Sequence, residues 1–132
     1  MKKVMEISVA LTDCFRVCGQ TATASLVLFG GSVSGDFFNG TILPGGVDTQ
    51  IMKDGKTALS ARYIAEGTDT EGVPTRIFIE NNSADDGGET VPHILTDNPA
   101  LSWLETAHLR GRIKPSDAGV IIEIFCPGGE IK

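Results

Sequence analysis

Two carboxylates stand where they could do acid–base chemistry inside a folded chain. Asp48 follows a turn formed by Pro44-Gly45-Gly46. Glu105 lies near the single tryptophan, Trp103, in a segment where every second residue is mostly apolar, and it occupies one of those otherwise apolar positions. Burial against apolar side chains raises the pKa of a carboxyl group, so an inward-facing Glu105 would be an acid or base usable near neutral pH. If the strand end is twisted, Glu105 is instead simply solvated. The sequence leaves both interpretations open.

The position of Arg62 relative to Asp48 depends on one hairpin. Asp54-Gly55, between two strand-like runs, is a strong hairpin signal. With a two-residue loop, Asp48 faces Ala61 and Arg62 lies on the opposite face. With a three-residue loop and a bulge, Asp48 comes opposite Arg62 and the two can pair. Such a pair, or an Asp48 that caps its own turn, can also be purely structural. Tyr63 is adjacent to Arg62, so without a bulge at most one of them faces the interior.

Nucleophilic and metal chemistry find little support in the sequence. The chain has three cysteines and two histidines, namely Cys14, Cys18, Cys126, His93 and His108. The odd number of cysteines argues against a disulfide framework and indicates buried free thiols in a reducing compartment. Since zinc-type ligand spacing is missing, we expect neither a structural metal nor another cofactor. There is no Gly-x-Ser-x-Gly motif, and nothing in the sequence brings a cysteine beside a histidine.

Composition indicates one globular domain over residues 1–132, with 41% hydrophobic and 21% charged residues. A formal net charge of −6 disfavours nucleic acid and anionic membranes as partners, because both require clustered basic residues. The one basic cluster, Arg110, Arg112 and Lys114, is interpreted as a solvated face. The N-terminus carries two lysines like a secretory leader, but Glu6 interrupts its apolar region, and no apolar window is long enough for a membrane helix. We therefore expect a soluble, cytoplasmic protein.

Period-two alternation dominates the chain, as in Met5, Ile7, Val9 and Leu11. Further strand-like segments are 21–29, 32–43, 47–53, 56–66, 75–81, 90–95, 100–113 and 119–126. Segment 100–113 has the composition of a helix, but its apolar residues fall mainly on one parity, which predicts a strand. The glycine-rich stretch 30–50 suits tight turns and kinked strands, and it lacks the spacing of a phosphate loop. The pattern predicts an all-β fold, a small antiparallel up-and-down β-barrel of about eight strands.

Four ordered motifs carry a family resemblance: GGSVSGDFFNGTILPGGVDTQ, LSARYIAEGTDTEG, RIFIENN and ILTDNPALSWLETAHLRGRI. Over residues 5–125 the chain resembles the domain of unknown function 3237 family, also called uncharacterised protein family 0311. The resemblance implies a lipocalin-like or allene-oxide-cyclase-like barrel and no assigned reaction. The family's Gly-Gly-x-Asp-x-Gln motif matches here with Asp48 and Gln50. Its Asp-Ala-Arg-Tyr matches residues 60–63 with serine at 60, and its Trp-Leu-Asn matches residues 103–105 with glutamate at 105.

Two functional classes follow from this fold and these residues. In the first, the barrel binds or transforms a small apolar metabolite. The sequence leaves open whether such a protein is an enzyme. The polar anchors would be Asp48, Gln50, Arg62 and Glu105, and the apolar walls Tyr63 and Trp103. In the second, the barrel is filled and the functional surface is an oligomer interface. A homo-oligomer is expected in either class, because strands such as LVLF and VIIEIF are apolar on both faces.

Overall fold

The protein is described by a computed structural model that covers residues 1–84, 88–117 and 119–132. Within these ranges, nine strands form a single antiparallel sheet. In chain order they are β1 (Lys2–Cys18), β2 (Thr23–Ser34), β3 (Phe38–Ile42), β4 (Gly46–Lys53), β5 (Lys56–Asp69), β6 (Pro74–Ser83), β7 (Glu89–Thr96), β8 (Arg110–Pro115) and β9 (Gly119–Cys126). Two short 3-10 helices complete the chain, η1 (Pro99–Glu105) and η2 (Gly128–Glu130).

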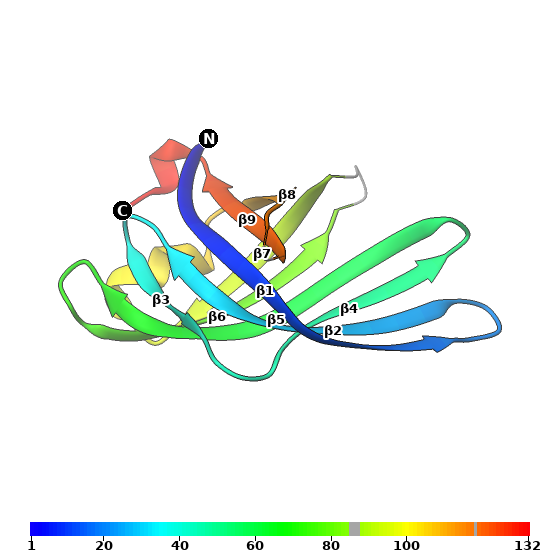
Figure 1. The fold of residues 1–132 in the computed structure, drawn as a ribbon. Helices are drawn as coiled ribbons and strands as arrows, with labels where there is room; N and C mark the ends of the chain where they lie inside the picture. Colours follow the sequence, from blue (N-terminus) through cyan, green and yellow to red (C-terminus); the bar gives the residue numbers. More distant parts are fainter. Residues whose placement is uncertain (85–87, 118) are drawn as a thin grey trace.

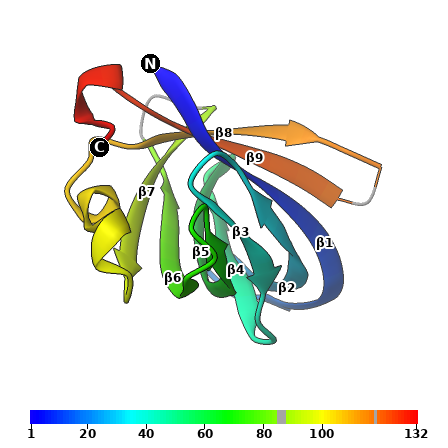
Figure 2. The same ribbon diagram turned by 90° about the vertical axis from the view of Figure 1, so that its left-hand side faces the viewer.

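The sheet closes on itself, because β1 pairs with both β2 and β9 (Figure 2). Strands β3 and β4 share one place in the ring: each pairs with β2 on one side and β5 on the other. They act as one strand interrupted around Leu43, whose backbone N–H donates to the carbonyl of Ile64 at 2.8 Å. The predicted antiparallel barrel of about eight strands is therefore confirmed.

Two long hairpins extend beyond the ring as arms, β1–β2 and β4–β5 (Figure 1). Strand β1 pairs with β9 only as far as Ala10, and its register with β2 shifts between Leu11 and Asp13. Beyond this bulge, β1 has β2 alone beside it. Cys14 and Cys18 lie on this arm and are exposed, whereas Cys126 is buried in the ring. The prediction of buried thiols is thus wrong for the two cysteines of the arm.

The β4–β5 arm settles the register question. Lys53 pairs with Lys56, which leaves Asp54-Gly55 as a two-residue turn, and both turn residues have positive φ, 53° and 75°. That is the geometry of a type I′ hairpin, which Asp-Gly favours. Asp48 consequently lies opposite Ala61, and Arg62 falls on the other face of β5.

Segment 100–113 differs from its prediction as a single strand. Pro99–Glu105 forms η1, and strand structure begins only at Arg110. Asn98 caps the helix by accepting a hydrogen bond from the backbone of Ala100 at 2.9 Å, and a proline at the first position is pre-set for helical φ. Leu101 and Leu104, three residues apart, both turn into the core, which is the period of a 3-10 helix. No helix of the described residues is long and apolar enough to cross a membrane.

The interior is filled at one end. Side chains with almost no exposed surface gather there, including Met5, Ile7, Val33, Phe38, Ile77, Ile79, Ile94, Leu104 and Ile124. Helix η1 lies at this end, away from the two arms (Figure 1). There the ring of Trp103 meets that of Phe37 edge to face, with centroids 5.1 Å apart. The packed end thus holds the barrel together, and the arms extend from the opposite end.

Candidate functional site

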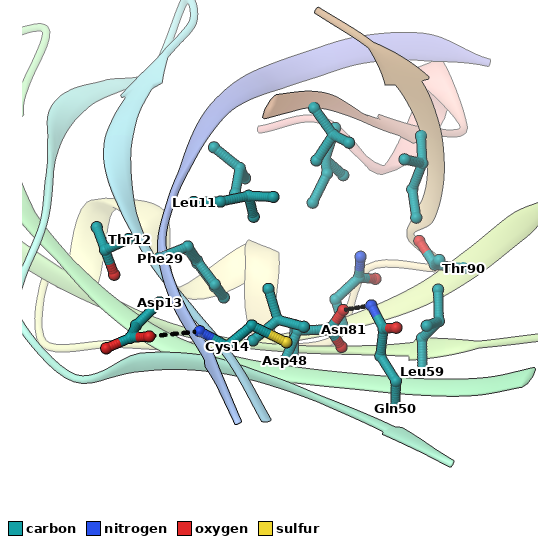
Figure 3. A pocket seen from close by; sticks show the side chains of 16 residues that line it. Leu11, Thr12, Asp13, Cys14, Phe29, Asp48, Gln50, Leu59, Asn81 and Thr90 are labelled. Atoms are coloured by element: carbon teal, nitrogen blue, oxygen red, sulfur yellow. Dashed lines mark hydrogen bonds between the residues drawn. The ribbon is translucent and has the colours of Figure 1, made fainter. Parts of the chain in front are cut away.

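A cavity of about 620 Å³ opens at the base of the two arms (Figure 3). Most of its wall is apolar, and its polar groups are few. The lining residues are Val9, Leu11, Thr12, Asp13, Cys14, Val27, Phe29, Asp48, Gln50, Leu59, Ala61, Asn81, Thr90, Ile113, Val120 and Ile122. Its size lies within the range of ordinary small-molecule sites, roughly 300–1,000 Å³.

Strand register places one row of these residues across five strands. Cys14 is the partner of Val27, Val27 of Asp48, Asp48 of Ala61, and Ala61 of Asn81. Cross-strand partners in register share a face of the sheet, so all five side chains lie on the face that lines the cavity. The row ends on polar Asn81, and the centre of the row carries the carboxylate.

Asp48 is half buried and held by its neighbour on β4. The side-chain amide of Gln50 donates to Asp48 Oδ2 at 2.9 Å (Figure 3). The other oxygen, Oδ1, is buried and has no hydrogen-bond partner among the described residues. Burial raises the pKa of Asp48, and the hydrogen bond from Gln50 and the nearby backbone N–H of Ser60 oppose that shift in part. This carboxyl group therefore takes up a proton more readily than a solvated aspartate does.

Two further polar side chains complete this wall, Asn81 on β6 and Thr90 on β7. Each is only 3% exposed. Within the described part of the chain, Asn81 Oδ1 and Thr90 Oγ1 have no hydrogen-bond partner. Both border Gly111, the strand partner of Thr90: a methyl group built there would clash with Thr90 Oγ1 and lie 3.6 Å from Asn81 Oδ1. The Thr90 hydroxyl therefore occupies the place that a side chain at position 111 would take.

The sequence interpretation missed Asn81 and Thr90. A signal for Asn81 exists, because it continues the parity of Ile77 and Ile79, both of which are fully buried. A polar residue at the end of a buried apolar row points to a site or a hydrogen-bonded core group. Thr90 gives no comparable signal, since a threonine is ordinary in a strand.

Only part of the predicted ligand set is brought together. Asp48 and Gln50 both line the cavity. Arg62 lies on the outer face of β5, because the two-residue turn places Ala61, and not Arg62, opposite Asp48. On that face Arg62 Nε donates to Glu80 at 2.8 Å. Glu105 is exposed on η1 and accepts a hydrogen bond from the backbone of Thr96 at 3.0 Å. Of the two orientations that the sequence leaves open for Glu105, the structure has the solvated one, because the segment is helical rather than extended.

The two predicted apolar walls belong to the interior but not to the lining of the cavity. Tyr63 is buried beneath it and meets Phe29 edge to face, with ring centroids 5.2 Å apart. Burial raises the pKa of the Tyr63 phenol far above its usual range. Trp103 packs at the opposite end of the barrel, against Phe37. Both are core residues, which is the more common role of a lone large aromatic side chain.

The wall of the cavity offers few kinds of chemical group. No lysine, arginine or histidine occurs among the described residues that line it. Nor do the described residues contain a group of three or more histidine, cysteine or acidic side chains arranged to hold a metal ion. What the wall offers is apolar surface, one desolvated carboxyl group, and oxygen atoms that lack donors.

Comparison with known proteins places the chain in a family. The family described as "Protein of unknown function (DUF3237)" matches residues 1–99, and the chain belongs to it. A UPF0311 protein of Clostridium acetobutylicum is 48% identical over 66 residues, which is 49% of this chain. The matched region spans 37% of that relative's length.

Solved structures share the fold over nearly the whole chain. A crystal structure of a protein with unknown function from Clostridium acetobutylicum ATCC 824 superposes with a TM-score of 0.80 at 26% identity, covering 95% of this chain and 94% of that one. A crystal structure of a β-barrel-like protein from Acinetobacter baumannii AYE gives a TM-score of 0.74 at 18% identity, covering 95% and 93%. The second similarity concerns the fold alone.

Proposed function

We propose that this member of the DUF3237 family binds a small, largely apolar molecule in the cavity at the base of its arms. The observation that carries the proposal is the combination of an apolar space of about 620 Å³ with three lining residues, each of which has a buried oxygen without a hydrogen-bond partner among the described residues. Leaving a buried polar group unpaired costs about 1–3 kcal/mol, so a ligand that pairs with these oxygens recovers that energy on binding.

The contrast between the two ends of the barrel supports this proposal. A barrel that serves only as a scaffold gains stability by filling its interior with side chains, as the packed end does. At the arm end, the small side chain of Ala61 stands where a larger one would fill the space. The carboxyl group of Asp48 also gives the site a proton acceptor, so the same cavity suits an enzyme that moves a proton on its ligand.

A fluorescent apolar probe tests the proposal. N-phenyl-1-naphthylamine is uncharged, fluoresces strongly only in apolar surroundings, and is small enough for the cavity. We expect saturable binding at one site per chain, with a Kd on the order of micromolar, as ligand-efficiency limits allow for a molecule of its size. An absence of saturable binding by this probe, in protein shown to be folded by circular dichroism, would contradict the proposal.

A second candidate function, self-association, is favoured by the outer face of the arms. Register places Phe15 beside Leu26, and Val17 beside Ala24, which in turn pairs with Ile51. Phe15, Val17, Leu26 and Ile51 are all exposed. Because this face carries no charge at these positions, it can meet the same face of a second copy without burying an unpaired ion.

We therefore propose that two copies associate through this face. Light scattering at tens of micromolar is expected to give twice the chain mass of 13.9 kDa, and Leu26→Lys is expected to return the protein to a single chain. Lys2→Ala, at the far end of β1, is the control and leaves the mass unchanged. A wild-type particle of 13.9 kDa would overturn the proposal.

A further inference from the structure

We propose that the ligand of this cavity carries a hydrogen-bond donor, a hydroxyl or N–H group, on an otherwise apolar frame, and that the cavity rejects carboxylates of the same frame. The inference rests on the proposed function and names the chemical class of the ligand. It comes from the polar atoms that the wall presents and from the charges that it lacks.

The fully buried atoms of the wall that lack a partner are predominantly acceptors. Asn81 Oδ1 is an amide oxygen and can only accept a hydrogen bond. Asp48 Oδ1 can only accept as long as its carboxyl group is ionised, and the Thr90 hydroxyl can accept or donate. None of the three has a partner within the described residues. A ligand that brings only acceptors, such as an ether or a ketone, leaves at least two of these oxygens unpaired. A ligand that brings a hydroxyl or N–H group supplies the missing donor.

The atoms are held in place for this role. The Gln50 amide binds Asp48 Oδ2 at 2.9 Å, which fixes the carboxyl group and leaves Oδ1 as the free oxygen. Asn81 lies in the same cross-strand row as Asp48, separated from it by the small side chain of Ala61. The Thr90 hydroxyl packs where a side chain at position 111 would lie, so the glycine lets Thr90 take this place. Asn81 and Thr90 both line the cavity, so a ligand there lies against the side chains that carry these oxygens.

Charge excludes anionic ligands. The titratable side chains among the described lining residues are Asp13, Cys14 and Asp48, so no cation is present there to neutralise a carboxylate. A ligand carboxylate would lose its hydration and would also face the carboxyl group of Asp48. Both effects oppose binding, because a buried charge is costly without a partner and a like charge adds repulsion.

A matched set of three ligands tests this inference. 2-Naphthol, naphthalene and 2-naphthoate share one apolar frame and differ in the polar group, and each can be titrated against bound N-phenyl-1-naphthylamine. We expect 2-naphthol to compete about tenfold more strongly than naphthalene, which corresponds to about 1.4 kcal/mol. We expect 2-naphthoate not to compete at pH 7.

Two isosteric variants assign the effect to the wall. Asp48→Asn keeps the shape and removes the charge, so it should admit 2-naphthoate and reduce the preference for 2-naphthol. Thr90→Val removes the hydroxyl group and should weaken 2-naphthol while leaving naphthalene unchanged. Asp36→Asn, an exposed carboxylate at the packed end, is the control and should change none of the three affinities.

The outcomes separate this inference from the proposed function. If naphthalene or 2-naphthoate competes as well as 2-naphthol, the inference on ligand class is overturned while the cavity remains a binding site. The same conclusion follows if Asp48→Asn and Thr90→Val leave the order of the three ligands unchanged. If the fluorescent probe itself does not bind, the proposed function fails first.

Discussion

Phenylalanine is expected to reduce stability at one alanine of β5 and ligand binding at another, four residues away on the same strand. Ala61 and Ala65 both point into the barrel from β5, but Ala61 lines the cavity and Ala65 is fully buried in the packed end. Ala65→Phe should lower the free energy of unfolding by roughly 1–3 kcal/mol or more, the usual cost of overpacking a filled core. Ala61→Phe should change it by less than about 1 kcal/mol and weaken probe binding at least tenfold, because the new ring occupies the ligand's space.

The neighbours of the two alanines explain the difference. Ala65 pairs with Ile42 and Ile77, both buried, so an added ring has no room. Ala61 pairs instead with Asp48 and Asn81, and the space above it is open. Urea unfolding of the two variants, paired with probe titrations, measures both effects. If Ala61→Phe proves as destabilising as Ala65→Phe, the arm end is not hollow and the cavity account is wrong.

Truncating Trp103 is expected to give a large loss of stability with little loss of binding. The side chain is 9% exposed and packs on Phe37 at the end of the barrel remote from the cavity. Phe and Trp to Ala substitutions in cores cost about 3–5 kcal/mol, and we expect Trp103→Ala to fall in this range. Affinity for the probe, measured below the unfolding transition, should stay within about twofold of the wild type.

Leu95→Ala provides the matched control, since this apolar side chain on β7 is exposed and its loss should change stability by less than about 0.5 kcal/mol. A Trp103→Ala variant that folds stably but no longer binds the probe would contradict the account. That result would restore Trp103 to the ligand wall that the sequence alone suggested.

Much of the fold could be predicted from sequence because its signals are local. Alternation of apolar and polar residues along β1, β5 and β6 reflects a sheet with one face inside, and Asp54-Gly55 fixes a turn with two positive φ angles. What the local pattern could not decide was the length of that turn, and with it the face of Arg62. The register of a hairpin follows from the whole turn geometry rather than from the identity of one pair of residues.

The errors arise where the tertiary structure overrides a local pattern. Leu101, Trp103 and Leu109 fit a period of two, but Asn98-Pro99 starts a helix that the period does not reveal. The site was only half recognised for a similar reason. Asp48 and Gln50 stand out beside a turn, whereas Asn81 and Thr90 become neighbours of the same cavity only through the pairing of β5, β6, β7 and β8. The pairing of strands that are far apart in the sequence cannot be predicted from any single segment.

The most direct test of the central claim is a crystal structure of the protein with 2-naphthol bound. We expect the naphthalene rings in the cavity at the base of the arms, against the apolar wall, with the hydroxyl oxygen within 3.2 Å of Asp48 Oδ1, Asn81 Oδ1 or Thr90 Oγ1, the reach of a hydrogen bond. A structure at saturating 2-naphthol in which side chains fill that cavity, or in which the ligand lies only on the outer surface, would contradict the account.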